Sequence, residues 1–180
     1  DGMMPVMPPE KNGKRIALLG AGPASLTVAR DLLPLGYDIT LYEKDPAGGG
    51  LMRTNIPSFR LPITVLDEEV DRVVNLGVHT KFGQEITSLK SVLDENYDSV
   101  FVGTGAGYPS FPGIPGEHAA QVYSANEYLT RVNLMGGDRF PFEDTPVHIG
   151  NSVVVIGAGN TGMDCLRVAR RMGADTVRCL

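Results

Sequence analysis

The chain has 180 residues, a hydrophobic content of 42% and a formal net charge of −5. This length allows one domain and part of a second, and the lack of a large basic block argues against nucleic acid or an anionic membrane surface as the main partner. No run of residues approaches the roughly 18 apolar residues of a membrane span, and no signal-peptide pattern is present, so we expect a soluble, cytoplasmic protein.

The first part of the chain predicts a strand, a glycine turn, a helix and a second strand. Residues 1–13 are rich in Met and Pro without periodicity, which indicates a linker or an arm. The apolar run 15–19 predicts a buried strand that leads into the glycine-rich stretch 20–25. An apolar helical face follows and stops at Gly36, and residues 38–42 predict the next strand.

The middle of the chain continues this α/β pattern. We expect an amphipathic helix at 65–76, strands at 78–82 and 99–102, and a proline-stiffened crossover after Pro109. A further helix is expected at 124–133, with Ser124 as the N-cap and Glu127 completing a capping box.

The last thirty or so residues repeat the first unit. Residues 152–156 predict a buried strand, 157–162 a glycine turn, 163–172 a helix and 176–180 the start of a strand. Four pairs of positions correspond at a constant offset: Gly20 with Gly157, Gly22 with Gly159, Ser25 with Gly162, and Gly36 with Gly173. An internal repeat of this kind favours two related nucleotide-binding units.

A glycine turn between strand and helix is typical of dinucleotide binding. The first glycine permits the bend, the second lets the backbone approach a pyrophosphate, and the third small residue lets the helix pack on the strand. The helix N-terminus then presents free N–H groups to phosphate. Glu43 ends the second strand, where a carboxylate can accept hydrogen bonds from a ribose. The alternative is a glycine-rich turn of an ordinary α/β domain.

The second turn has all three glycines but no acid at the position that the offset assigns. That position is Leu180, and a missing acid favours NADP over NAD, although a shift of register by one or two residues stays possible. The glycine run 48–50 predicts backbone that passes close to a flat cofactor or its diphosphate, with a flexible turn as the alternative. Arg53 and Arg60 are the nearby cations.

The sequence predicts no catalytic side chain and no metal site. Cys165 and Cys179 form no CxxC motif, and the three histidines have no nucleophile or acid at a recognisable spacing. This absence is consistent with chemistry that bound cofactors carry out.

Several stretches resemble the glutamate synthase small-subunit family, which includes the flavin portion of dihydropyrimidine dehydrogenase. Residues 14–25 are similar to its FAD-binding turn, and the Ile-Pro-Ser-Phe-Arg-Leu-Pro run at 56–62 is the more diagnostic match. Residues 49–53, 101–106, 122–125 and 157–164 match as well, so the resemblance extends from about residue 11 to the end.

The resemblance implies which residues contact each cofactor. For FAD these are Gly20, Ala21, Gly22, Pro23, Ala24, Ser25, Glu43, Lys44, Gly50, Leu51, Arg60 and Ile86, with the matching stretch Gly103, Thr104 and Gly105. For the diphosphate of NADP they are Gly157, Ala158, Gly159, Asn160, Thr161 and Gly162. Ile86 is expected at the end of the strand that follows Gly77.

The resemblance also implies the fold and the activity. The fold class is α/β, a two-dinucleotide-binding-domain flavoprotein fold (Rossmann-like, glutathione-reductase-like) that is incomplete at the C-terminus. The expected division is 1–13 linker or arm, 14–110 first part of the FAD-binding domain, 111–150 crossover, and 151–180 start of the NAD(P)-binding domain. NADPH would reduce FAD, and electrons would leave through iron–sulfur clusters to a partner subunit.

The chain departs from this family in two ways. It lacks a cysteine-rich iron–sulfur segment before the first turn, and it is considerably shorter. We therefore expect iron–sulfur clusters in missing segments or in a partner, and no activity from these 180 residues alone. The alternative function is a non-catalytic nucleotide-binding scaffold or assembly subunit of a redox complex.

Overall fold

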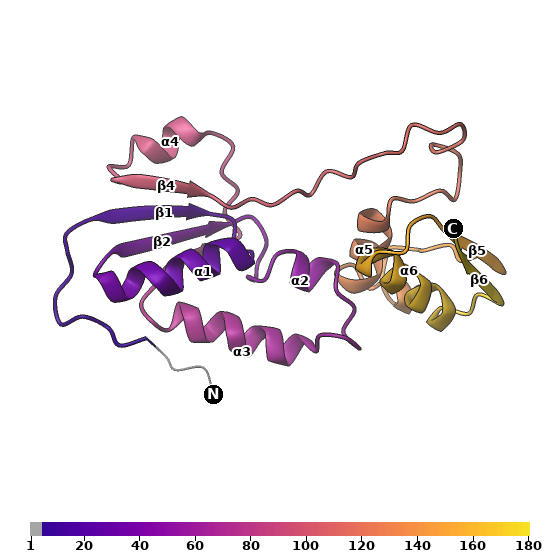
Figure 1. Cartoon of the computed structure of the whole chain (residues 1–180), viewed down its shortest axis with the longest axis horizontal. Helices are drawn as coiled ribbons and strands as arrows, with labels where there is room; N and C mark the ends of the chain where they lie inside the picture. The colour runs from indigo at the N-terminus through magenta and orange to yellow at the C-terminus, as the bar shows by residue number, and fades with distance from the viewer. Residues whose placement is uncertain (1–4) are drawn as a thin grey trace. The chain divides into compact units, whose positions relative to one another are not determined.

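A computed structural model of the chain describes residues 5–180, so the first four residues of the expected linker 1–13 lie outside the described residues. Residues 5–13 form neither helix nor strand. The chain forms two compact units, one of Asp1–Met52 with Ile63–Gly105 and one of Arg53–Pro62 with Ala106–Leu180 (Figure 1).

The first unit is built on a parallel sheet. Its four strands within residues 5–180 have the order β3-β2-β1-β4, and every pair is parallel. They are β1 (Arg15–Leu19), β2 (Asp38–Glu43), β3 (His79–Phe82) and β4 (Ser99–Val102). Because parallel neighbours need a crossover, helices join them: α1 (Pro23–Leu32), α3 (Ile63–Val74) and α4 (Leu89–Leu93).

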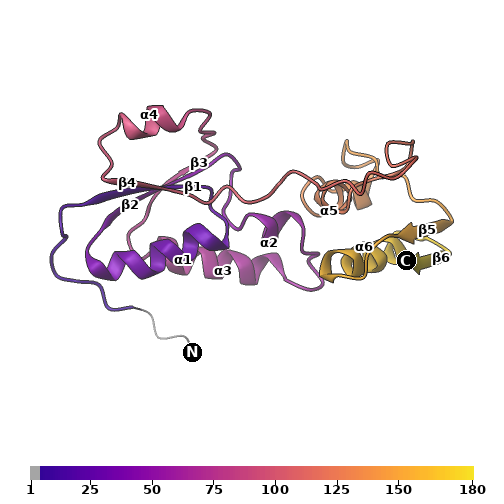
Figure 2. The same ribbon diagram turned by 45° about the horizontal axis from the view of Figure 1, so that its top comes forward.

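The sheet is covered on both faces, which gives three layers. Leu18 and Ile39 belong to the core on the side of α1 and α3, whereas Leu19 and Tyr42 belong to the core under Val92 of α4. This division follows from the alternation of side chains along a strand. Figure 2 shows α1 and α3 on one side of the sheet and α4 on the other.

The structure confirms the predicted strands and the longer helices of this unit to within a few residues. Helix α1 passes into a short 3-10 turn (Leu33–Leu35) and ends at Gly36, whose φ of +87° is the left-handed conformation that favours glycine. Two short helices were not predicted, α2 (Leu51–Thr54) and α4, because five residues or fewer show no helical period.

The second unit contains a smaller version of the same pattern. In its described residues β5 (Ser152–Val155) pairs in parallel with β6 (Thr176–Cys179), and α6 (Asn160–Arg171) connects them. Its core is formed by Tyr128 and Leu129 of α5 (Ala125–Asn133) and by Cys165 and Val168 of α6. Burial raises the pKa of the Cys165 thiol to about 11, so this side chain fills space as a protonated, apolar group.

The predicted N-cap of α5 is present, and the capping box is present in one half. The Ser124 hydroxyl accepts a hydrogen bond from the backbone N–H of Glu127 at 3.1 Å. The Glu127 carboxylate instead accepts from Arg131, one turn along the helix, at 2.8 Å. Over residues 5–180, every helix is too short or too polar to cross a lipid bilayer.

The core of the first unit gives a direct test of the sheet assignment. Replacing Leu41, which is fully buried in β2, by Ala should cost about 2–5 kcal/mol of unfolding free energy because it leaves a cavity. Leu35→Ala, at a position that is 63% exposed, should change it by less than about 0.5 kcal/mol. Urea unfolding followed by circular dichroism measures both, and equal effects would contradict this packing.

Candidate functional site

The first glycine turn lies at the carboxyl end of β1, between β2 and β4. The Gly20 N–H donates to the carbonyl of Tyr42 at 2.8 Å, and the Gly103 N–H donates to the carbonyl of Leu19 at 2.8 Å. Gly20 has a φ of +90°, and a Cβ there would lie 2.6 Å from the Gly103 carbonyl oxygen. Backbone conformation and close packing therefore both require glycine at position 20.

Gly22 differs, because the protein's own packing gives no reason for a glycine there. It is the N-cap of α1 with an ordinary φ of −78°, and a Cβ built on it would meet nothing within 4 Å. The turn is thus open at the helix N-terminus, where free N–H groups attract phosphate. Pro23 occupies the first helical turn, and Ala21 is fully buried.

Ser25 fills the third position of this turn and is fully buried. A Cβ on Gly103 would lie 2.3 Å from the Ser25 hydroxyl oxygen, so the glycine that follows β4 leaves the room that the serine occupies. Among the described residues the Ser25 hydroxyl has no hydrogen-bond partner. A serine therefore fits at position 25 because residue 103 is glycine. The glycine-turn motif alone does not show this compensation.

Glu43 is buried beside the turn and is bonded to it. One carboxylate oxygen accepts from the Ala21 N–H at 2.7 Å, and the other accepts from the Asp45 N–H at 3.0 Å. Each oxygen can accept a further hydrogen bond. The sequence indicates the acid but not its bond to the turn. Lys44 is exposed, and its ion pair with Asp45 at 3.0 Å raises its pKa.

The glycine run 48–50 packs against the same turn. The Gly49 N–H donates to the Ala21 carbonyl at 2.8 Å, and a Cβ on Gly50 would lie 2.9 Å from the Cα of Gly22. On its other side a Cβ on Gly49 would lie 2.9 Å from Leu66 of α3. The run is glycine because it passes between the turn and α3. The exposed Leu51 then begins α2.

Three further residues predicted to contact FAD lie farther along the same unit. Thr104 and Gly105 follow the end of β4, beyond the Gly103 that contacts Ser25. Ile86 is not at a strand end as expected, because β3 stops at Phe82 and Ile86 lies four residues beyond it. It packs, partly buried, against the core under α4. Contact of these residues with FAD stays a prediction.

The second glycine turn repeats this construction in the second unit. Gly157 has a φ of +106°, and Gly159 is the N-cap of α6 with open space around its Cβ position. A Cβ on Gly162 would lie only 2.1 Å from the Gly157 carbonyl oxygen, so the third glycine is required for packing of helix on strand. Asn160 and Thr161 begin the exposed first turn of α6.

The strand register corrects the comparison of Leu180 with Glu43. In the first unit the Gly20 N–H donates to Tyr42, whereas in the second the Gly157 N–H donates to Leu180. Leu180 therefore corresponds to Tyr42, and the position that corresponds to Glu43 comes one residue later. The cause is one extra residue after the second helix: two residues separate Gly173 from β6, whereas one separates Gly36 from β2. Leu180 consequently gives no argument for NADP over NAD.

Arg60 lies in the second unit and is paired. Its guanidinium donates to the Asp164 carboxylate at 2.6 Å, and the Asp164 side chain is only 4% exposed. Arg167 approaches the other carboxylate oxygen at 3.5 Å, and that oxygen has no hydrogen-bond partner among the described residues. The sequence did not predict this pair, and contact of Arg60 with FAD stays a prediction.

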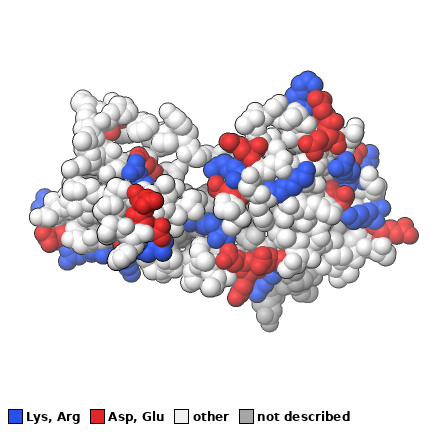
Figure 3. Space-filling view, turned by 180° about the vertical axis from the view of Figure 1, so that it is seen from behind, with Lys and Arg blue, Asp and Glu red and all other residues white. Residues whose placement is uncertain are grey.

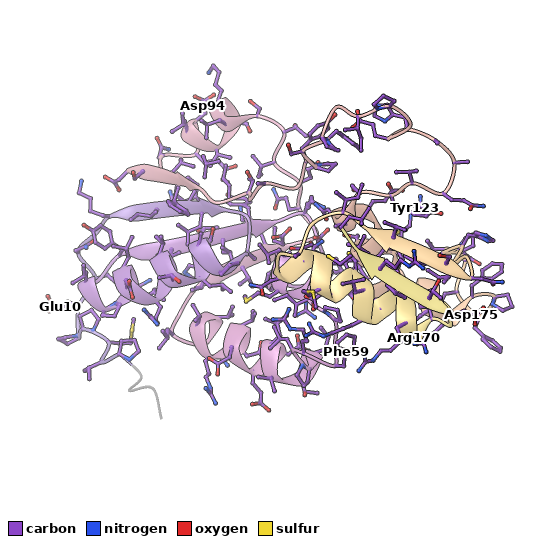
Figure 4. The ribbon with its side chains drawn as sticks, turned by 45° about the vertical axis from the view of Figure 1, so that its right-hand side comes forward. Glu10, Phe59, Asp94, Tyr123, Arg170 and Asp175 are labelled. Atoms are coloured by element: carbon purple, nitrogen blue, oxygen red, sulfur yellow. The ribbon has the colours of Figure 1, made fainter. Side chains whose placement is uncertain are left out.

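A neighbouring contact strengthens the same region. The Arg171 guanidinium lies 3.8 Å from the centre of the Phe59 ring, close enough for a cation–π interaction. Figure 4 labels Phe59 among the side chains drawn as sticks. On the face shown in Figure 3, acidic and basic side chains are interspersed, without a large field of one sign.

A protein-family model, described as pyridine nucleotide-disulphide oxidoreductase, matches residues 14–180. Three curated relatives are similar. One is the NAD-dependent dihydropyrimidine dehydrogenase subunit PreT of Salmonella typhimurium, 35% identical over 96% of this chain and 40% of its own length. The second is the NADP(+)-dependent formate dehydrogenase subunit beta of Moorella thermoacetica, 37% identical over 94% of this chain and 23% of its own length. The third is the NADPH-Fe(3+) oxidoreductase subunit beta of Geobacter sulfurreducens, 36% identical over 95% of this chain and 25% of its own length. The chain thus spans between 23% and 40% of the length of these relatives.

Solved structures agree on the fold. FprA of Mycobacterium tuberculosis, in complex with NADPH, superposes with a TM-score of 0.73 at 23% identity, over 86% of this chain and 36% of that one. A 2-naphthoyl-CoA reductase complex superposes with a TM-score of 0.72 at 21% identity, over 94% and 24%. These similarities confirm the α/β fold that the sequence predicted.

Replacement by alanine should affect stability differently at Gly159, which has open space around it, and at Gly162, which is packed against backbone. Gly162→Ala should cost about 1–3 kcal/mol of unfolding free energy, because the added Cβ collides with backbone. Gly159→Ala should cost less than about 0.5 kcal/mol, since its Cβ enters open space at an ordinary φ. Urea unfolding in the absence of nucleotide measures both, and the reverse order would refute the assigned turn geometry.

Proposed function

Because this chain belongs to the pyridine nucleotide-disulphide oxidoreductase family, we propose that it forms the cofactor-binding part of an FAD-dependent NAD(P)H oxidoreductase. The subunit takes hydride from NADPH onto FAD and passes electrons to iron–sulfur clusters or to a partner subunit. FAD binds at the turn of residues 20–25, and the nicotinamide dinucleotide binds at the turn of residues 157–162. We further propose that residues 14–110 carry the first site and that residues 151–180 open the second domain.

The observation that carries this proposal is the open second glycine in both turns. Gly22 and Gly159 each stand at a helix N-terminus, and each has empty space where a side chain would be. The fold itself does not need glycine at either position, but a diphosphate that approaches the backbone does. A protein that binds no dinucleotide would have no reason to keep both positions clear, whereas reduction of bound flavin separates the enzyme from a nucleotide-binding scaffold.

The chain's own residues bind and orient the cofactors. When bound, the nicotinamide and the flavin supply the hydride chemistry. Glu43, held by the Ala21 and Asp45 N–H groups, offers its remaining acceptor capacity to ribose hydroxyls. The N-termini of α1 and α6 offer N–H groups and a positive dipole end to the two diphosphates.

The relatives' names support a redox partner and leave the nicotinamide dinucleotide open. All three are named as subunits, and one is named as NAD-dependent, one as NADP-dependent and one for NADPH. We propose NADPH as the donor, with NADH as the alternative. The rival function, a non-catalytic assembly subunit, predicts no reduction of bound flavin by either nucleotide.

Anaerobic reduction tests the proposal in the full-length subunit, because no activity is expected from these 180 residues alone. Loaded with FAD, it should lose flavin absorbance on addition of NADPH, faster than with NADH. Gly22→Ala should fold with unchanged stability but bind FAD at least about tenfold more weakly, because its Cβ enters the diphosphate path. Gly150→Ala, whose Cβ would meet only an ordinary contact at 3.7 Å, is the matched control. Flavin that neither nucleotide bleaches would favour the assembly subunit.

Glu43 should have two separable effects. Glu43→Ala should weaken FAD binding by about 1–3 kcal/mol, the scale of hydrogen bonds to a charged group. It should also lower the melting temperature of the cofactor-free protein, because the Ala21 and Asp45 N–H groups lose their acceptor. Fluorescence titration and calorimetry measure the two effects, with the exposed Asp31→Ala as the control. Wild-type FAD affinity would mean that Glu43 only supports the turn.

A further inference from the structure

Residues 53–62, here called the strap, fold with the second unit although they come from the middle of the first. The Asn55 amide donates to the side-chain oxygen of Asn126 at 2.9 Å, and the Asn133 amide donates to the Thr54 carbonyl at 3.2 Å. Pro57 is fully buried. These contacts fix the beginning and the middle of the strap on the unit that carries α6.

The strap also forms an ion pair with α6. Arg60 donates to the buried carboxylate of Asp164 at 2.6 Å. Charge-assisted bonds of this kind are about twice as strong as neutral ones, and a buried carboxylate is costly without its partner. Asp164 lies four residues after Asn160, the first residue of α6, which is roughly 6 Å along the helix. The ion pair therefore attaches the strap to α6 close to the N-terminus that would bind a diphosphate.

The other end of the strap is continuous with the first glycine turn. Helix α2 begins at Leu51 in the first unit and ends at Thr54 in the strap. Just before it, the Gly49 N–H is bonded to the Ala21 carbonyl, and Gly50 lies against Gly22. A short helix and a tightly packed loop thus join the strap to the backbone of the first turn.

We propose that the strap couples the two dinucleotide sites, with Arg60 and Asp164 as its positioning residues. The inference rests on the proposed function. Nucleotide bound at the N-terminus of α6 holds this helix, the ion pair holds the strap, and α2 holds the loop 48–50 against the first turn. Occupancy of the second site therefore stabilises the first, and by linkage FAD strengthens binding of the nicotinamide dinucleotide by the same factor.

Hydrogen exchange in the full, FAD-free chain separates the steps. Addition of NADP⁺, or of NAD⁺ in a parallel arm, should slow exchange in a peptide covering 157–162 and also in one covering 46–54. In Arg60→Gln, Asp164→Asn and the double variant, the first peptide should still be protected but the second should not. The three variants should lose protection of the peptide 46–54 to the same extent, because each removes the same ion pair.

A matched variant controls for loss of charge. Arg139→Gln removes an exposed arginine of the same unit, paired with Glu143 at 3.2 Å, and should leave protection of both peptides intact. FAD titrations should show affinity raised at least about fivefold by the nucleotide in wild type and less than about twofold in the three variants. Protection at 157–162 without protection at 46–54 in wild type would overturn the coupling. Absence of protection at both peptides with either nucleotide would overturn the proposed function as well.

Discussion

The bond between the Glu43 carboxylate and the Ala21 N–H is the interaction on which the first site depends. It ties the end of β2 to the turn that follows β1, and the second carboxylate oxygen orders the backbone at Asp45. The loop 48–50 packs against the same glycine turn, where the Gly49 N–H donates to the Ala21 carbonyl. The sheet, the acid and the glycine run are therefore joined through the backbone of Ala21.

Much of this arrangement could be predicted from the sequence. Buried parallel strands are short apolar runs, and glycines at fixed spacing between such a run and a helix are typical of a dinucleotide-binding turn. The constant offset between Gly20 and Gly157 indicates the second unit from the amino-acid order alone. Hydrophobic period could not reveal α2 or α4, since neither is long enough to repeat.

Other features could be found only in the three-dimensional structure. Arg60 and Asp164 are far apart in sequence, and no local pattern pairs them. The equivalence of Leu180 with Glu43 failed because a constant offset assumes connections of equal length, and the connection from Gly173 to β6 is one residue longer than that from Gly36 to β2. Ile86 was misplaced for a different reason: its position at a strand end was taken with the resemblance, although the strand predicted at 78–82 already ends, as β3 does, four residues before it.

The fit of Ser25 against Gly103 has an evolutionary consequence. A side chain at position 103 would collide with the serine hydroxyl, so the two positions share one small volume. Across descendants of a common ancestor they should covary, with glycine or alanine at 25 wherever 103 acquires a Cβ. A side chain gained at position 103 while serine remains at 25 would be removed by selection on folding, before any effect on a cofactor.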